Sequence, residues 1–338
     1  MLVSVIVPCR NERHHIERFL DNVLRQRSEG FQLEILVADG HSDDGTREIV
    51  EQFAAKYPYI RLIDNPRGIV STGLNAAIRE AQGDIIVRMD VHTEYADDYI
   101  ARCVDVLLRT GAENVGGPWV ARGSDLISRA IALAFQSHFG SGGAKSHDPN
   151  YEGPVDSVYL GCWPRRTFER FGLFDEDLVR NQDNEHNLRI WRMGGRVWQS
   201  PAIRSWYHPR SSLRKLWRQY VQYGYWKTRV VRKHRIPASP RHLIPGAFVG
   251  VVTMLGGIGL VSSTARTMWV VLLLVYGLAL IGASAWVCKA RNAWRYFYLI
   301  PVVFAIMQIG YGYGFLMGLA DIVFRQGRST DALASLSR

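Results

Sequence analysis

Three long uncharged stretches in the last third of the chain constrain its fold more than any other feature. They cover residues 243–265, 267–288 and 296–320 of 338. A helix of about 20 mainly apolar residues is long enough to cross the hydrocarbon layer of a bilayer. Because the stretches follow one another and are joined by loops that contain arginine, they predict three transmembrane helices rather than buried core helices.

Charge is distributed very unevenly along the chain. From His186 onward there are 21 Lys and Arg residues but two acidic residues, whereas the first 185 residues carry 20 basic and 29 acidic groups. This asymmetry places two regions in different electrical environments and argues against a uniformly basic nucleic-acid-binding protein. Ten Lys and Arg residues and no acidic residue lie between 209 and 241, and such juxtamembrane clusters favour the anionic cytoplasmic leaflet. The positive-inside rule then predicts that everything before the first stretch is cytosolic.

The third apolar stretch leaves an alternative open. Three crossings would put the C-terminus outside, yet Arg325 and Arg328 follow this stretch, in mild conflict with the same rule. A re-entrant third segment is therefore the alternative to a third crossing. Gly310, Gly314 and Gly318 form a stripe of small residues, which predicts the close approach of another helix.

The first 200 residues alternate between strand and helix patterns. Strands are expected at 4–8, 34–38, 60–63, 84–89, 115–119 and 155–159, and helices at 14–26, 46–54, 70–81, 126–139 and 182–193. Strands separated by helices predict a mostly parallel sheet, with ligands bound at the carboxyl ends of its strands.

Polar side chains follow three of these expected strands. Glu12 follows the first, Asp39 the second, and Asp90 and His92 the fourth. Each acid alone is as well explained as a helix cap. Together they predict clustered carboxylates at one sheet edge, where a divalent metal or a hydrogen-bonding base would offset their repulsion.

Four segments resemble the inverting family-2 glycosyltransferases, which have a GT-A fold. They are VSVIVPCRNE (3–12), ILVADGHSDDGT (35–46), GLNAAIREAQGDIIVRMDVH (73–92) and VRNQDNEHNLRIWRMGGRVWQSP (179–201). They occur in family order, and the likeness covers residues 5 to about 233. More narrowly, the chain resembles the bacterial exopolysaccharide enzymes of the succinoglycan β-glucosyltransferase type. The family's D-x-D segment reads D-x-H here, and its E-D segment reads Q-D.

This resemblance implies roles for individual residues. Nucleotide-sugar contacts fall on Pro8, Arg10, Glu12, Asp39 and Asp90, with Asp39 accepting the uracil N3–H. Asp90 and His92 would hold Mg²⁺ or Mn²⁺, and the imidazole favours Mn²⁺ because it is a softer ligand than carboxylate. The ion would neutralise the diphosphate leaving group, although His92 merely donating a hydrogen bond to the diphosphate is a second interpretation.

Asp183 stands in the position of the catalytic base. A carboxylate within hydrogen-bond reach can take the proton of an attacking sugar hydroxyl. Gln182 precedes it where the family usually has Glu, and Glu185 follows two residues later on another helix face. From the residues alone, Asp183 and Glu185 cannot be told apart as the base.

Further contacts to donor sugar or acceptor are weaker expectations. Trp163 lies where family members bind sugars, although a core position explains it better. Gln222, Tyr223 and Trp226 have the spacing of the processive enzymes' Q-x-x-R-W motif, but Tyr225 replaces its arginine. An aromatic and basic helix at the lipid surface explains this segment equally well. The missing arginine and the few membrane helices argue against a processive synthase.

The resulting prediction is an α/β chain of four parts: a cytosolic GT-A domain at 1–208, a basic interface helix at 209–242, three transmembrane helices within 243–324, and a tail at 325–338. The expected enzyme is a multi-pass protein of the bacterial inner membrane, contacting membrane lipids but no nucleic acid. It would transfer a β-linked hexose, glucose from UDP-glucose, to a polyprenyl-diphosphate-linked saccharide during exopolysaccharide assembly. The alternatives are transfer to polyprenyl monophosphate, and a membrane scaffold or nucleotide-binding regulator without transfer activity.

Overall fold

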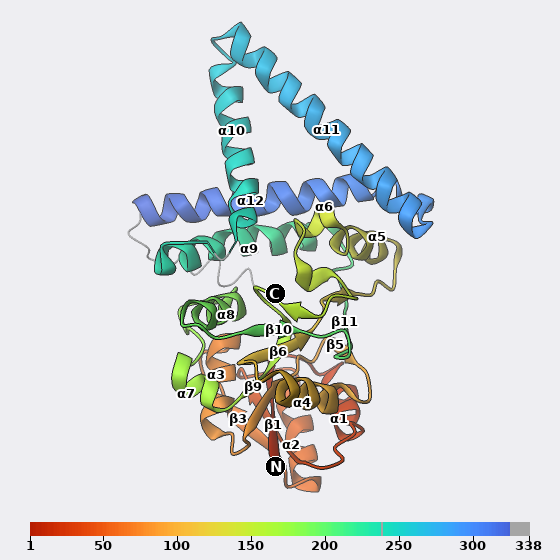
Figure 1. The fold of residues 1–338 in the computed structure, drawn as a ribbon, viewed down its shortest axis with the longest axis vertical. Coiled ribbons are helices and arrows are strands. Elements are labelled where there is room, and N and C mark those ends of the chain that lie inside the picture. Colours follow the sequence, from red (N-terminus) through yellow and green to blue (C-terminus); the bar gives the residue numbers. More distant parts are fainter. Residues whose placement is uncertain (238, 325–338) are drawn as a thin grey trace. The chain divides into compact units, whose positions relative to one another are not determined.

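The computed structural model describes residues 1–237 and 239–324, which form two compact units (Figure 1). The sheet unit contains Met1–Val120 and Asp148–Tyr207, and the helical unit contains Ala121–His147 together with the residues from His208 onward. The sequence predicted one continuous domain over residues 1–208, whereas the structure groups Ala121–His147 with the helical unit. The predicted tail, with Arg325 and Arg328, lies outside the described residues.

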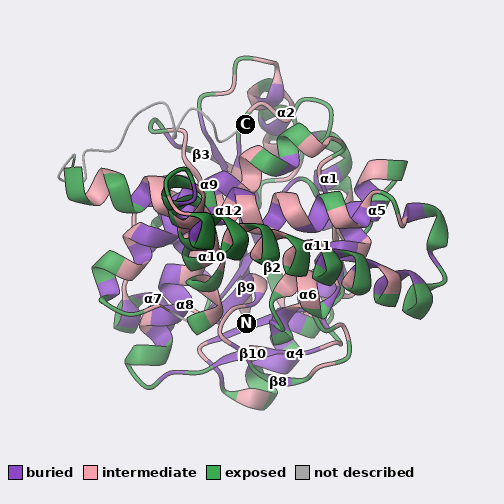
Figure 2. Cartoon of the chain, turned by 90° about the horizontal axis from the view of Figure 1, so that it is seen from above, coloured by how far each residue is buried: buried purple, intermediate pink, exposed green. Residues whose placement is uncertain are grey.

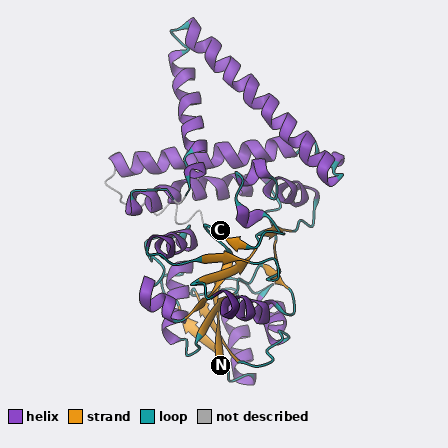
Figure 3. Ribbon diagram, in the orientation of Figure 1, coloured by secondary structure: helices purple, strands orange, loops and turns teal. Residues whose placement is uncertain are grey.

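The sheet unit is built on eight strands in the order β3-β2-β1-β4-β9-β6-β10-β8. Figure 3 shows the strands of this unit in orange, with helices around them. β1 lies between β2 and β4 and is parallel to both, and β3 continues this parallel part beside β2. β9 runs antiparallel to its neighbours β4 and β6. The bounds are β1 Leu2–Cys9, β2 Gln32–Asp39, β3 Ile60–Asp64, β4 Ile85–Arg88, β6 Asn114–Gly117, β8 Gly153–Pro154, β9 Tyr159–Pro164 and β10 Val197–Gln199.

A second, smaller sheet has the order β5-β11-β7, with bounds Thr93–Tyr95, Ser205–Tyr207 and Val120–Ala121. The strand expected at 155–159 is wrong. The chain instead forms the short β8 before it and β9 from Tyr159, and β9 carries the apolar and small residues that pair with β4 and β6.

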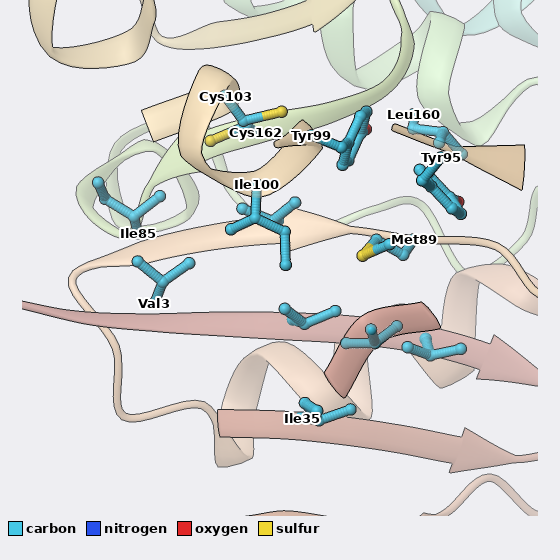
Figure 4. Packing of buried hydrophobic residues seen from close by; sticks show 14 of the residues in the cluster. Val3, Ile35, Ile85, Met89, Tyr95, Tyr99, Ile100, Cys103, Leu160 and Cys162 are labelled. Atoms are coloured by element: carbon cyan, nitrogen blue, oxygen red, sulfur yellow. The ribbon is translucent and has the colours of Figure 1, made fainter. Parts of the chain in front are cut away.

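Helices cover both faces of the large sheet. Successive residues of β1 point to opposite faces, so Val5 and Val7 join one apolar cluster and Ile6 joins the other. Helices α1, α2 and α4 pack on the first cluster, where Tyr95 and Tyr99 meet edge to face (Figure 4). Helices α3, α7 and α8 pack on the second. The bounds are α1 Ile16–Leu24, α2 Thr46–Lys56, α3 Val70–Glu80, α4 Tyr99–Thr110, α7 Arg166–Phe171 and α8 Gln182–Arg192.

The helical unit contains the three apolar stretches. Its elements are α5 Leu126–Phe135, α6 His138–Ser141, η1 Lys145–His147, α9 Leu213–His234, η2 Pro240–His242, α10 Ile244–Ile258, α11 Ser263–Arg291, η3 Trp294–Tyr296 and α12 Ile300–Phe324. Among the described residues of this unit, three helical segments are long and apolar enough to cross a membrane: Pro240–Ile258, Ser263–Arg291 and Ile300–Phe324. Helices α10 and α11 are largely exposed (Figure 2), as lipid-facing helices would be in the absence of lipid.

Helix α12 packs lengthwise along α9. A Cβ atom on Gly314 or on Gly224 would collide with a backbone oxygen of the other helix. The predicted close approach at the glycine stripe is thus confirmed, and the partner is the basic, aromatic helix α9. Near the end of α12, Tyr225 of α9 donates a hydrogen bond to Asp321 at 2.5 Å. The two helices therefore run side by side in the same direction.

Candidate active site

The carboxyl ends of four parallel strands bring the predicted polar residues to one edge of the large sheet. Asp39 ends β2 and Asp64 ends β3, while Glu12 and Asp90 follow β1 and β4. Strands β1 and β4 are direct neighbours, which places the turns after them next to each other. Pro8 lies near the end of β1, and Arg10 is exposed just beyond that strand.

The buried carboxylate of Asp39 is held by the loop that follows it. The backbone N–H of Ser42 donates to Asp39 at 3.1 Å, and the Ser42 hydroxyl donates at 2.5 Å. Arg47, in the first turns of α2, forms ion pairs with Asp39 at 3.5 Å and with Asp64 at 3.3 Å. These contacts fix the orientation of the Asp39 carboxylate, as recognition of a base N–H requires.

The turn between β1 and α1 sets the positions of Glu12 and His15. Asn11 adopts a left-handed conformation with φ of 53°, and the Glu12 carbonyl accepts hydrogen bonds from the N–H groups of His15 and Ile16. The Glu12 N–H in turn donates to the Thr46 hydroxyl at 2.7 Å. The backbone thus fixes two chemically useful side chains three residues apart.

His92 reaches this turn from the end of β4. Its Nε2 lies 2.8 Å from a Glu12 carboxylate oxygen, and its ring centroid lies 4.8 Å from that of His15. Burial lowers the pKa of His15, and the nearby His92 lowers it further. Both conditions favour a neutral His15 imidazole, the form that binds metal ions.

Asp90 is paired with an arginine two residues earlier in the chain. Arg88 donates to both of its carboxylate oxygens, at 2.8 Å and 2.9 Å. Arg88 ends β4 and Asp90 follows two residues later, so the two side chains lie close together at the end of this strand. Burial alone would lower the pKa of Arg88, but the carboxylates of Asp90 and Asp183 outweigh it and raise this pKa. Arg88 therefore links the D-x-H segment electrostatically to the expected base.

Helix α8 separates its two acidic residues. Glu185 is fully buried and pairs with Arg189 at 2.8 Å. Arg189 also donates to the carbonyls of Phe171 and Leu173, so this pair anchors α8 to the preceding loop. Asp183 is partly exposed and accepts a hydrogen bond from the N–H of Asn184 at 2.8 Å. Of the two carboxylates, Asp183 is the one available to a substrate.

The neighbours of Asp183 on α8 are buried in the core. Gln182 is 7% exposed, and His186 stacks on Phe168 with 5.3 Å between ring centroids. Burial lowers the pKa of His186 to about 3. Trp163 also packs against Phe168 and is 1% exposed. The structure thus gives Trp163 a core position, as its sequence surroundings favour.

Two features of this edge were missed by sequence reasoning. His15 could have been found, because it lies one helical turn from Glu12. The second feature is an aromatic cluster in which Trp119 stacks on Tyr159 at 5.2 Å, with Tyr207 edge-on to Trp119 at 5.7 Å. These residues are far apart in the sequence, and only the sheet topology brings them together.

The remaining expected residues belong to helix α9 in the helical unit. Gln222 and Trp226 are buried, and Tyr223 is partly buried. The Arg229 guanidinium lies over the rings of Tyr225 and Trp226, at 5.5 Å and 5.4 Å from their centroids. Tyr225, which replaces the arginine of the processive motif, is engaged by Asp321 of α12. The aromatic residues at 225 and 226 therefore contribute to packing within the helical unit.

Comparison with known proteins identifies the class. Residues 4–166 match the family Glycosyl transferase family 2, and a relative that is 31% identical spans almost the whole chain. The chain therefore belongs to glycosyltransferase family 2, and it is a glycosyltransferase. That relative is Succinoglycan biosynthesis protein ExoA of Rhizobium meliloti (strain 1021), in an alignment of 319 residues that covers 94% of each chain.

Other relatives and solved structures agree with this assignment. A dolichyl N-acetyl-alpha-D-glucosaminyl phosphate 3-beta-D-2,3-diacetamido-2,3-dideoxy-beta-D-glucuronosyltransferase of Methanococcus voltae is 28% identical, over 68% of this chain and 74% of its own. The mannosyltransferase PcManGT from Pyrobaculum calidifontis, solved with GDP-Man and Mn²⁺, superposes with a TM-score of 0.60 at 23% identity, covering 94% of this chain and 87% of that one. Staphylococcus aureus TarS 1–349 gives 0.52 at 14%, covering 97% and 92%. These likenesses confirm the GT-A fold.

Proposed function

We propose that this glycosyltransferase adds a β-linked hexose, glucose from UDP-glucose, to a polyprenyl-diphosphate-linked saccharide during exopolysaccharide assembly. The similarity to the succinoglycan biosynthesis protein, over 94% of both chains, carries the proposal because it includes the membrane helices as well as the sheet unit. A hydrophobic anchor suits an acceptor whose saccharide is presented at the surface of a bilayer.

The sheet edge supplies the donor site. Asp39 accepts the uracil N3–H, while Pro8, Arg10 and Glu12 line the nucleotide. The donor set around His92 suits a divalent ion, with nitrogen and carboxylate ligands favouring Mn²⁺ over Mg²⁺. When bound, such an ion supplies charge neutralisation for the departing diphosphate.

Asp183 then acts as the general base. Its carboxylate is partly exposed, whereas the buried carboxylate of Glu185 forms an ion pair with Arg189. The Arg88 guanidinium interacts electrostatically with both Asp183 and Asp90, which supports a shared site. An acceptor hydroxyl that loses its proton to Asp183 attacks from the side opposite the diphosphate, so the anomeric centre inverts.

The same proposal places the chain in the bacterial inner membrane with its sheet unit in the cytosol. Helices α10 and α11 form the crossing hairpin. Helix α9 carries seven of the ten juxtamembrane basic residues, so it stays at the lipid surface, and α12 lies along it. We therefore favour the re-entrant alternative for α12, with a cytosolic C-terminus. A C-terminal tag that reacts with an impermeant label from the periplasm would refute this placement.

Transfer to a polyprenyl monophosphate remains the second candidate, because such an acceptor is already anionic and needs no base. The Methanococcus voltae relative, by its name, acts on a dolichyl-linked sugar phosphate, which favours a saccharide-bearing acceptor.

Release of UDP tests the enzyme's donor directly. Purified full-length protein in bacterial membrane extract should release UDP from UDP-glucose, and chelation should stop the release until Mn²⁺ is restored. Unchanged release after exhaustive chelation would refute metal dependence. Release from GDP-sugars alone would refute the donor assignment.

A further inference from the structure

Three metal-ligating side chains gather at the sheet edge, and one of them belongs to no motif. Glu12, His15 and His92 each offer a ligand atom, and these atoms lie within 4.8 Å of one another. Two of the side chains come from the turn after β1 and the third from the end of the neighbouring strand β4. The Glu12 and His92 atoms are already 2.8 Å apart, so His15 is the side chain that would have to move toward a bound ion.

The backbone holds this cluster in place. The Glu12 N–H is fixed to Thr46, and its carbonyl accepts from the N–H of His15 at 2.8 Å. Asn11 is tied to the next loop as well, since its side-chain amide donates to Asp43 at 2.8 Å. A preformed turn of this kind reduces the conformational cost of assembling a ligand set.

The carboxylate oxygens of Asp90, by contrast, already have hydrogen-bond donors. Both of its carboxylate oxygens accept hydrogen bonds from Arg88, whose side chain is only 8% exposed. An ion bound through Asp90 would compete with a buried guanidinium that has no other carboxylate at this distance among the described residues. The His92 side chain is 59% exposed, and it already points at Glu12.

We propose that the divalent ion of this enzyme is held by Glu12, His15 and His92, with His15 as a third protein ligand and Asp90 left on Arg88. This inference rests on the proposed metal-dependent function and refines its ligand set. One carboxylate and two imidazoles form a borderline donor set, which favours Mn²⁺, Co²⁺ or Zn²⁺ and leaves Mg²⁺ a weak competitor. Three protein ligands would leave further positions of such an ion for diphosphate oxygens.

Spectroscopy of bound Mn²⁺ counts the ligands without requiring transfer. The full-length protein is stripped of metal, loaded with Mn²⁺ without donor, and examined for hyperfine coupling to imidazole nitrogen. Two coupled imidazoles are expected in the parent protein. His15→Ala should show one and bind Mn²⁺ at least about tenfold more weakly, since even outer partners of metal ligands change affinity tenfold or more. His14→Ala is the matched control, because His14 is an exposed neighbour outside the cluster, and it should behave like the parent.

Two further variants test whether His15 binds the ion or only supports the fold, and whether Asp90 is a ligand. His15→Asp should restore Mn²⁺ affinity with one imidazole coupled, which a folding defect would not allow. Asp90→Asn should keep both imidazoles. A single imidazole in the parent protein, or unchanged coupling and affinity in His15→Ala, would overturn the inference. If two imidazoles couple to Mn²⁺ but the protein transfers sugar from no UDP-sugar, the proposed function alone is refuted. If the protein transfers glucose from UDP-glucose but His15→Ala binds Mn²⁺ as the parent does, the ligand set alone is refuted.

Discussion

The sheet unit and the helical unit use polar residues in opposite ways. In the sheet unit, Asp39, Asp90 and Asp183 stand at or near the ends of elements in the proposed active site, and each is held by short local hydrogen bonds or ion pairs. In the helical unit, polar groups such as Tyr225 and Asp321 bind each other between helices. Substitution in the first unit should therefore remove function from a folded protein, whereas substitution in the second should disturb packing.

The largest expected effect separates two carboxylates of one helix. Asp183→Asn keeps size and most hydrogen bonds but cannot accept a proton, so transfer should fall about 10² to 10⁴-fold with near-normal UDP-glucose affinity. Glu185→Gln weakens the buried pair with Arg189 and should lower the melting temperature with a milder loss of rate. Rates and donor affinities of both variants, measured side by side, check this. An essential Glu185 and a dispensable Asp183 would move the base by two residues.

A methyl group placed between α9 and α12 tests the helical side of the comparison. In Gly314→Ala the new Cβ would collide with the Val221 carbonyl oxygen, and overpacking of this kind costs about 1–3 kcal/mol or more. Gly277→Ala on α11 is the control, because a Cβ there has nothing within 4 Å. Thermal unfolding in detergent should show a lower transition for the first variant and an unchanged one for the second. Equal transitions would mean that the two helices do not pack as described.

These two experiments also mark how far sequence reasoning reached. Hydropathy was enough to find α10, α11 and α12, and motif order was enough to select Asp39, Asp90 and Asp183 as candidates. Neither could show that α9 is the partner of the glycine stripe, since helix pairing depends on three-dimensional packing. Likewise, the sequence left Asp183 and Glu185 equivalent until Arg189 was found to neutralise one of them.

Nucleotide choice gives a smaller effect within the sheet unit. Asp39→Ala removes the acceptor for a base N3–H, so UDP affinity should fall by roughly tenfold, the worth of about 1.4 kcal/mol for a charge-assisted hydrogen bond. Cytosine lacks this proton, and the parent protein should therefore prefer UDP to CDP. Titration of both nucleotides by calorimetry provides the check, and equal affinities in the parent would refute the role of Asp39.

The smallest effect is a pH dependence of stability in the sheet unit. The pKa of His186 is lowered to about 3 in the folded protein, so the unfolded chain binds its proton first as pH falls. Stability is complete above the ordinary pKa of about 6.5 and should decline by up to about 1.4 kcal/mol per pH unit below it. His186→Phe should flatten this decline between pH 6.5 and 5. A parallel decline in both proteins would assign it to other groups.

The chemical nature of the product tests the central claim most directly. Membranes containing the full-length protein and a pool of polyprenyl-diphosphate saccharides are offered UDP-glucose and other UDP-sugars, and the lipid extract is measured by mass spectrometry. The account predicts a lipid-linked saccharide heavier by one hexose, formed from UDP-glucose and absent with Asp183→Asn. A polyprenyl monophosphate carrying a single hexose, formed equally well by Asp183→Asn, would contradict it.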